Sequence, residues 1–252
     1  MPKGSARGGR RSGRARRGAA PLLAALDLGT NNCRLLIARA VRGELRIVDS
    51  FSRIVRLGEG VSQSGQLSET AIERTVAALK ICAEHLRAKD VRHIRAVATE
   101  AARRASNAQV LLDRVRAETG IELEIITAEE EARLAAIGCA PLIDPEAEGG
   151  LIFDIGGGST EIIWMRRDGS RAPTVTAFAS EPVGVVTLAE SWSGPLDRAG
   201  YGQLRDQMIE RFRAVKARMD AVAPFDPETH HLLGTSGTVT TLAGIALGLA
   251  RY

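Results

Sequence analysis

The chain has 252 residues, 44% of them hydrophobic and 25% charged, which is ordinary for one large globular domain or two small ones. No apolar run approaches the ~18 residues of a membrane span, so the composition argues against an integral membrane protein. Three scattered cysteines, Cys33, Cys82 and Cys139, exclude a disulfide framework and a paired-cysteine metal site, and favour a reducing compartment.

The formal net charge of +4 is concentrated at the N-terminus. Residues 1–21 hold seven basic side chains and no acid, so the remaining chain carries 27 basic and 30 acidic residues, a net charge of −3. Low apolar content predicts that 1–21 is a disordered arginine- and glycine-rich tail. It is either a polyanion-binding arm or a solvated arm without a partner. No apolar targeting segment follows its arginine pairs, so we expect a cytoplasmic protein.

The first half of the body alternates strands and helices. Apolar runs predict strands over 22–26, 33–40 and 45–51, and Ser68 begins a helix whose apolar residues recur every three or four positions. A buried strand over 94–98 precedes helical segments that end at Gly120, and a strand over 121–126 follows. This alternation predicts an α/β fold.

The second half has the same character. We expect a helix over 129–139, strands over 151–155, 161–165 and 174–178, and a short strand over 231–233 before a final apolar helix. A long helix over about 197–222 carries a predicted core stripe. The stripe comprises Leu204, Met208, Phe212, Val215 and Met219.

One motif occurs twice, about half a chain apart. Asp27-Leu28-Gly29-Thr30 and Asp154-Ile155-Gly156-Gly157 each end one strand and lead into another. The repeat predicts two related α/β domains, 22–137 and 138–252, whose aspartate-glycine turns face each other across a cleft.

The composition of these turns indicates phosphate chemistry. Glycines allow close backbone approach and their N–H groups can line an anion site, while a strand-end aspartate can hold a divalent cation such as Mg²⁺. No lysine follows the glycines as in a Walker loop, and a strand rather than a helix follows Gly158, unlike a dinucleotide-binding loop. The alternative is a glycine hairpin with an incidental aspartate.

A third turn, 234–238, opens the last helix and offers N–H groups at a helix N-terminus. Three such turns favour a substrate with several phosphates. Glu161, two residues beyond Ser159, either faces the cleft beside Asp154 or faces solvent. Glu129 and Glu130 lie in the first turn of the predicted helix, where acidic side chains usually interact with the free N–H groups and the helix dipole. By periodicity alone Glu131 would have the same role.

Together the segments 27–31, 130–134, 154–161 and 234–238 resemble the Ppx/GppA family of exopolyphosphatases and guanosine pentaphosphate phosphohydrolases. The resemblance runs from about Pro21 to the end. It implies two actin-like (ribonuclease H-like) domains around a phosphate-binding cleft, and homodimers are common in the family.

The resemblance also implies roles for single residues. Glu131 corresponds to the catalytic base, and Asp154 and Glu161 to catalytic residues that hold Mg²⁺. The implied phosphate-binding residues are Asp27, Gly29, Thr30, Asn31, Arg103, Gly156, Gly157, Gly158, Ser159, Gly234, Ser236, Gly237 and Thr238. Arg104, next to Arg103, leaves that one assignment ambiguous.

Two features depart from the family pattern. Asn32 stands where serine is frequent, which is a mild polar exchange. The chain ends at Tyr252, whereas family members continue with further helices and a strand, so we expect the second domain to lack part of its core.

The function expected from these residues is hydrolysis of a terminal phosphoanhydride bond in polyphosphate or guanosine pentaphosphate, with water activated by Glu131. One alternative is a polyphosphate- or alarmone-binding regulatory protein without turnover. The other is an ATP-dependent small-molecule kinase of the same superfamily, for which no acceptor pocket or catalytic aspartate is evident in the sequence.

Overall fold

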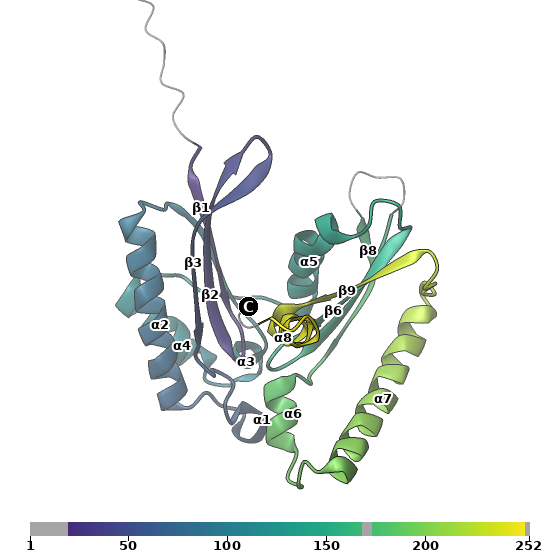
Figure 1. The fold of residues 1–252 in the computed structure, drawn as a ribbon. Coiled ribbons are helices and arrows are strands. Elements are labelled where there is room, and N and C mark those ends of the chain that lie inside the picture. Colours follow the sequence, from purple (N-terminus) through teal and green to yellow (C-terminus); the bar gives the residue numbers. More distant parts are fainter. Residues whose placement is uncertain (1–19, 168–172, 250–252) are drawn as a thin grey trace, which may run out of the picture.

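The computed structural model describes residues 20–167 and 173–249, so nearly all of the expected tail lies outside the described residues. The chain forms two sheets with helices packed on them, and the two halves converge at one end and diverge at the other (Figure 1). This arrangement confirms the expected α/β architecture with two actin-like halves.

The first sheet has the strand order β3-β2-β1-β4-β5. β1 is antiparallel to β2 and parallel to β4. The last strand is shorter than the predicted 121–126, because only two of its residues pair with β4. The strands are β1 (Leu22–Leu28), β2 (Asn32–Val41), β3 (Glu44–Ile54), β4 (His93–Ala98) and β5 (Glu124–Ile125).

The long helix α2 (Glu69–Ala88) and α4 (Ala108–Thr119) pack against one face of the first sheet and form its core with β1 and β2. The Ser68 hydroxyl accepts a hydrogen bond from the Ala71 N–H, which confirms it as the N-cap of α2. Gly120 ends α4 with a φ of 74°, a left-handed conformation that glycine adopts without strain. The opposite face of the sheet is turned toward the second half of the molecule (Figure 1).

The second sheet has the order β8-β7-β6-β9 and repeats the connections of the first. β6 is antiparallel to β7 and parallel to β9, just as β1 is to β2 and β4. The internal repeat of the sequence is therefore a repeat of topology. The strands are β6 (Gly149–Ile155), β7 (Thr160–Arg166), β8 (Thr174–Glu181) and β9 (His230–Thr235).

Helices cover both faces of this sheet. α5 (Ala128–Cys139) packs through Ala132 and Ala136 against Ile152 and Ile163 on one face. The predicted domain boundary at 137/138 therefore falls inside a helix that belongs with the second sheet. The 3₁₀ turn η1 (Ala140–Leu142) follows α5.

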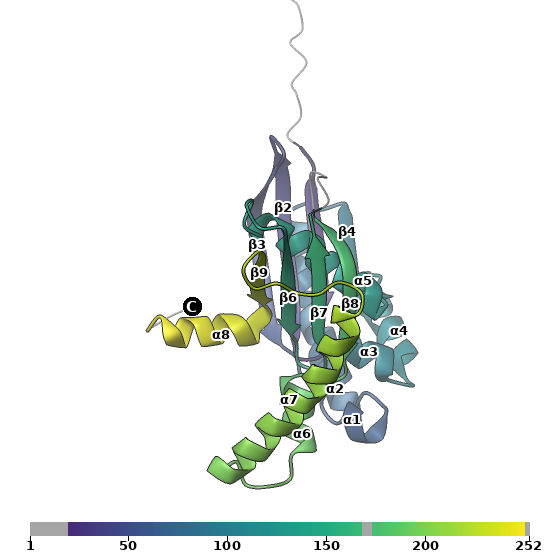
Figure 2. The same cartoon turned by 90° about the vertical axis from the view of Figure 1, so that its right-hand side faces the viewer.

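On the other face lies α7 (Arg198–Asp220), close to its predicted span. Val215 and Met219 of the predicted stripe are buried against Trp164, with Phe212 partly buried. Leu204 and Met208 are only half-buried, because the first half of α7 extends beyond the sheet (Figure 2). α8 (Ser236–Ala246) also projects from the end of β9.

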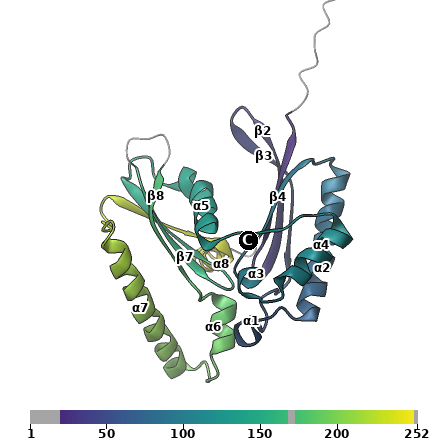
Figure 3. The ribbon, with the colours of Figure 1, turned by 180° about the vertical axis from the view of Figure 1, so that it is seen from behind.

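Three short helices complete the fold: α1 (Val61–Ser64), α3 (Glu100–Arg104) and α6 (Val185–Ser191). α1 and α6 lie side by side at the end where the two halves meet (Figure 3). α6 is absent from the sequence predictions. All three cysteines are free and buried. Among the described residues, no helix has both the length and the apolarity to cross a bilayer.

Candidate active site

The two aspartate-glycine turns have the same backbone structure. Gly29 donates its N–H to the Asn32 carbonyl at 2.9 Å, and Gly156 donates to the Ser159 carbonyl at 3.0 Å. Each turn joins two antiparallel strands in register, so both are glycine hairpins, the alternative considered from the sequence. They differ from incidental hairpins because they lie against each other.

The contact between the turns explains the glycines of the second one. A Cβ on Gly157 would lie 3.1 Å from Asn31 Cβ, and a Cβ on Gly158 would lie 2.4 Å from Thr30 Oγ1. Among the described residues, the N–H groups of Gly157 and Gly158 donate to no backbone carbonyl. The second loop thus combines close approach with available donors, as an anion site requires.

A cavity of about 100 Å³ lies between the turns and collects most of the predicted residues. It is lined by all three predicted catalytic carboxylates, which come from α5, β6 and β7. Its further lining includes Asp27, Gly29, Thr30, Asn31, Gly156, Gly157, Gly158, Ser159 and Ser236 from the predicted set, with Asn32, Arg34 and Thr99 in addition.

The residues of the third turn line two different cavities. Ser236 lines both, whereas Gly237 and Thr238 line only the neighbouring cavity of about 360 Å³ beside Asn31 and Gly156. Ser236 has a φ of 76°, a strained conformation for a serine, of a kind that clusters at functional sites.

Gly234 lies apart from both cavities. It is a residue of β9, and a Cβ there would approach the Phe153 ring to 2.6 Å. Its geometry indicates close packing inside the second domain, so the predicted contact with phosphate has no support from its position.

Asp154 and Glu161 lie directly opposite each other on β6 and β7. Burial raises the pKa of Glu161 to about 7, and the neighbouring charge of Glu131 adds to this increase. Hydrogen bonds from Ser159 and Ser180 act in the other direction. Burial also raises the pKa of Asp154. Glu161 is only 3% exposed, which excludes the solvent-facing alternative.

Glu131 lies in the first turn of α5, where Thr127 is the N-cap. Burial raises its pKa, while Arg103 acts in the opposite direction. Glu130, the preceding residue, points elsewhere and pairs with Arg133 and Arg95, which lower its pKa to about 2. The pKa values of the neighbouring glutamates therefore shift in opposite directions, and the one that lines the cavity has the higher proton affinity that suits a general base.

Arg103 holds Glu131 and has no place in either cavity. Its Nη1 donates to Glu131 Oε2 at 2.7 Å and to the Ile126 carbonyl at 2.9 Å, and its Nη2 donates to Glu100 Oε2 at 2.9 Å. With these donors occupied, Arg103 orients the glutamate in this structure. The phosphate contact implied by the resemblance stays a prediction.

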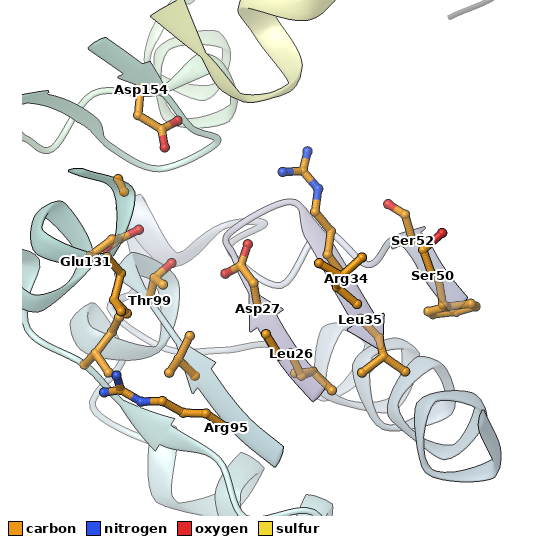
Figure 4. Close-up of a pocket in the computed structure, with 17 residues that line it drawn as sticks. Leu26, Asp27, Arg34, Leu35, Ser50, Ser52, Arg95, Thr99, Glu131 and Asp154 are labelled. Carbon is orange, nitrogen blue, oxygen red and sulfur yellow. The ribbon is translucent and has the colours of Figure 1, made fainter. Parts of the chain in front are cut away.

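Arg34 is the cation that the sequence predictions missed. It lies opposite Asp27 on β2, reaches toward Asp154 (Figure 4), and lowers the pKa of both aspartates against the effect of burial. The signal was in the alternation of β2: Cys33 and Leu35 are buried, so Arg34 between them faces the cleft.

A larger cavity of about 590 Å³ adjoins the carboxylates along the first sheet. Asp27, Glu131 and Asp154 line it, and Figure 4 shows Asp27 between Glu131 and Arg34. Its walls are mainly apolar and include Leu36, Phe51, Val97 and Leu134. The site thus has a small polar compartment and a larger apolar one.

The donor set is compatible with a magnesium ion. The described residues hold no cluster of three or more histidine, cysteine or carboxylate side chains close enough to bind a metal alone. Asp154 and Glu161 nevertheless provide two carboxylates directly opposite each other, and burial is the main cause that raises the pKa of each. One or two carboxylates with substrate phosphates is the usual protein environment of Mg²⁺.

Comparison with known proteins assigns the chain to a family. The sequence model of the Ppx/GppA phosphatase family matches residues 36–248. The chain belongs to the Ppx/GppA phosphatase family. It is 35% identical over 241 residues to exopolyphosphatase 2 of Mycobacterium tuberculosis, covering 91% of this chain and 72% of that protein.

A second curated relative and a solved structure are also similar to this chain. The guanosine-5'-triphosphate,3'-diphosphate pyrophosphatase of Photobacterium profundum is 33% identical over 237 residues, which cover 90% of this chain and 44% of that longer protein. The crystal structure of the Aquifex aeolicus family member is 33% identical with a TM-score of 0.71, covering 92% and 71% of the two chains.

Proposed function

We propose that this Ppx/GppA protein hydrolyses the terminal phosphoanhydride bond of inorganic polyphosphate or guanosine pentaphosphate. The observation that carries the proposal is the small cavity, in which Glu131, Asp154 and Glu161 meet both glycine turns. Relatives named for each of the two activities support the same reaction class.

The reaction is the attack of water on the terminal phosphorus. A bond forms between the water oxygen and phosphorus, and the bond from phosphorus to the bridging oxygen breaks. The bridging oxygen leaves with its electron pair on the shortened substrate. Glu131 accepts the proton of the water, a contribution of roughly 10²–10⁴-fold for general bases. Arg103 keeps its carboxylate oriented during this transfer.

Charge on the transferring phosphoryl group is balanced by the remaining residues. The residues that line the cavity include hydrogen-bond donors suited to phosphate oxygens, among them the N–H groups of Gly157 and Gly158 and the guanidinium of Arg34. Asp154 and Glu161 would hold Mg²⁺, which supplies positive charge to the phosphate oxygens when bound. Positioning and electrostatic stabilisation account for most catalysis in phosphoryl transfer.

The two cavities bear on the choice between the two candidate substrates. Both candidate substrates present a terminal phosphate to the small cavity. The apolar walls of the 590 Å³ cavity favour guanosine pentaphosphate as a substrate, because a nucleoside has a ring whose faces can be buried there and a polyphosphate chain has none.

Phosphate release from polyphosphate chains of several lengths and from guanosine pentaphosphate, with and without Mg²⁺, tests the proposal. We expect Mg²⁺-dependent release from at least one of them. Binding of both by calorimetry without any release would instead support a non-hydrolysing binding protein.

A further inference from the structure

One hydrogen-bonded contact joins the two halves behind the turns. Glu190, near the end of α6, accepts hydrogen bonds from the Gly60 N–H at 3.0 Å and from the Ser62 hydroxyl at 2.7 Å. The two donors belong to the start of α1 in the first half of the chain, so a single carboxylate is bound through both oxygens by the other domain. Figures 1 and 3 show α1 and α6 side by side at the end where the two halves converge.

The other end of α6 is attached to the second glycine turn. Val185 donates its N–H to the Gly156 carbonyl at 3.0 Å, and Val186 donates to the Gly157 carbonyl at 2.9 Å. A Cβ on Gly184 would lie 2.5 Å from the Gly156 oxygen, so helix and loop are in backbone contact. We expect α6 and this loop to move together.

The α1 segment is attached to the first glycine turn in the same way. Gly58 donates its N–H to the Thr30 carbonyl at 2.9 Å, and Val55 donates to the Asn31 carbonyl at 2.8 Å. A Cβ on Gly58 would lie 2.3 Å from Thr30 Cγ2. A continuous path therefore runs from the first turn through α1, Glu190 and α6 to the second turn.

We propose that Glu190 is a positioning residue that fixes the separation of the two glycine turns. The inference rests on the proposed function, because its consequence for activity assumes a substrate that contacts both turns. Misplacement of reacting groups by about 1 Å can cost ~10²-fold in rate. Loss of one interdomain contact among several should have a smaller effect, about 10-fold in kcat/KM.

A double-mutant cycle for phosphate release measures this role. Glu190→Gln and Ser62→Ala should each lower kcat/KM, by about 10-fold and a few-fold, and the double variant should be close to Glu190→Gln alone because both remove the same contact. Glu190→Asp should recover little activity, since the shorter side chain reaches only one donor. Glu118→Gln is the control, because Glu118 pairs with Lys80 and Arg114 inside the first half.

A distance measurement separates this proposal from the proposed function. Spin labels on exposed Arg87→Cys in α2 and Arg213→Cys in α7 report the separation of the two halves, and the three native cysteines are buried. We expect one narrow distance distribution, broadened by Glu190→Gln and unchanged by Glu118→Gln.

Each outcome decides the question. Broadening together with the kinetic loss supports the positioning role. An unchanged distribution, or additive kinetic effects in the cycle, would overturn it, and so would broadening without any kinetic loss. If the unmodified protein releases no phosphate, the proposed function fails, and the distance distribution alone then decides whether Glu190 fixes the two halves.

Discussion

The two glycine turns share a backbone and differ in charge. Asp27 lies opposite Arg34 across the first hairpin, whereas Asp154 lies opposite Glu161 across the second. Arg34 lowers the pKa of both aspartates, but the cross-strand partner of Asp27 is this cation, whereas that of Asp154 is a second carboxyl. The same turn therefore supports two tasks: the first contributes a cation, and the second is suited to bind one.

The turns also differ in side chains. The first presents Thr30 and Asn31, and the second presents glycine at the facing positions. Because side chains on one turn fill the space left by their absence on the other, the halves can approach closely. Each of the following predictions changes one residue of a turn or of a strand beside it, and the first compares the equivalent aspartates of the two turns.

Removal of the charge of Asp154 should have the largest effect. Asp154→Asn should lower kcat roughly 10²–10³-fold, because it removes one of the two carboxylates suited to Mg²⁺. Asp27→Asn should cost about 10-fold or less, since Arg34 remains at the cavity. Phosphate release over a range of Mg²⁺ concentrations measures both, and equal losses would mean that the turns are not specialised.

An added methyl group should distinguish the glycines. Gly158→Ala brings a Cβ against Thr30, so we expect the halves to separate and kcat/KM to fall by about 10²-fold. Gly29→Ala places its Cβ 3.6 Å from the nearest atom, the Asn32 oxygen, and should stay within about three-fold of the unmodified protein. If Gly158→Ala lowered kcat/KM only about as much as Gly29→Ala, the close contact between Gly158 and Thr30 would be contradicted.

Loss of the Arg34 guanidinium should weaken substrate binding. Arg34→Gln should raise KM about 10-fold with a smaller change in kcat, as expected for one charge-assisted contact with phosphate. The control is Arg46→Gln, on the exposed hairpin of the same sheet. A normal KM in Arg34→Gln would remove this residue from the phosphate site.

The pH dependence of stability should report on the buried carboxyl of Glu161 in the second half. Glu161 has a folded pKa of about 7, above its ordinary value of 4.5, so the folded protein holds a proton that the unfolded chain loses. Stability should therefore fall as pH rises from about 4.5 to 7 and then level off. Glu161→Gln should reduce this fall by on the order of 2 kcal/mol, measured by urea unfolding at several pH values.

Features that depend on local sequence were predicted well. The repeated aspartate-glycine motif predicted paired turns at a cleft, and the cavity contains both. Strand and helix positions followed from apolar periodicity. As expected, Ser68 begins a helix and Gly120 ends one. These signals lie within a few residues of the structure they specify.

Features that depend on distant contacts were missed. α6 begins with the β-branched residues Val185, Val186 and Thr187, and the N–H groups of these three residues donate to carbonyls of the second turn, so its start depends on a contact distant in sequence. The predicted domain boundary at 137/138 stays a prediction; α5, which contains it, follows the first sheet in sequence but packs on the second. The dimer, the cytoplasmic location and the role of the tail stay predictions.

The central claim is that Glu131 activates water at a cavity shared by both turns. The most direct test is phosphate release by Glu131→Gln, compared with Glu129→Gln, an exposed position on the same helix. We predict that Glu131→Gln binds polyphosphate or guanosine pentaphosphate with near-normal affinity by calorimetry but releases at least 10²-fold less phosphate. Glu129→Gln should behave like the unmodified protein. Release at the normal rate by Glu131→Gln would contradict the account.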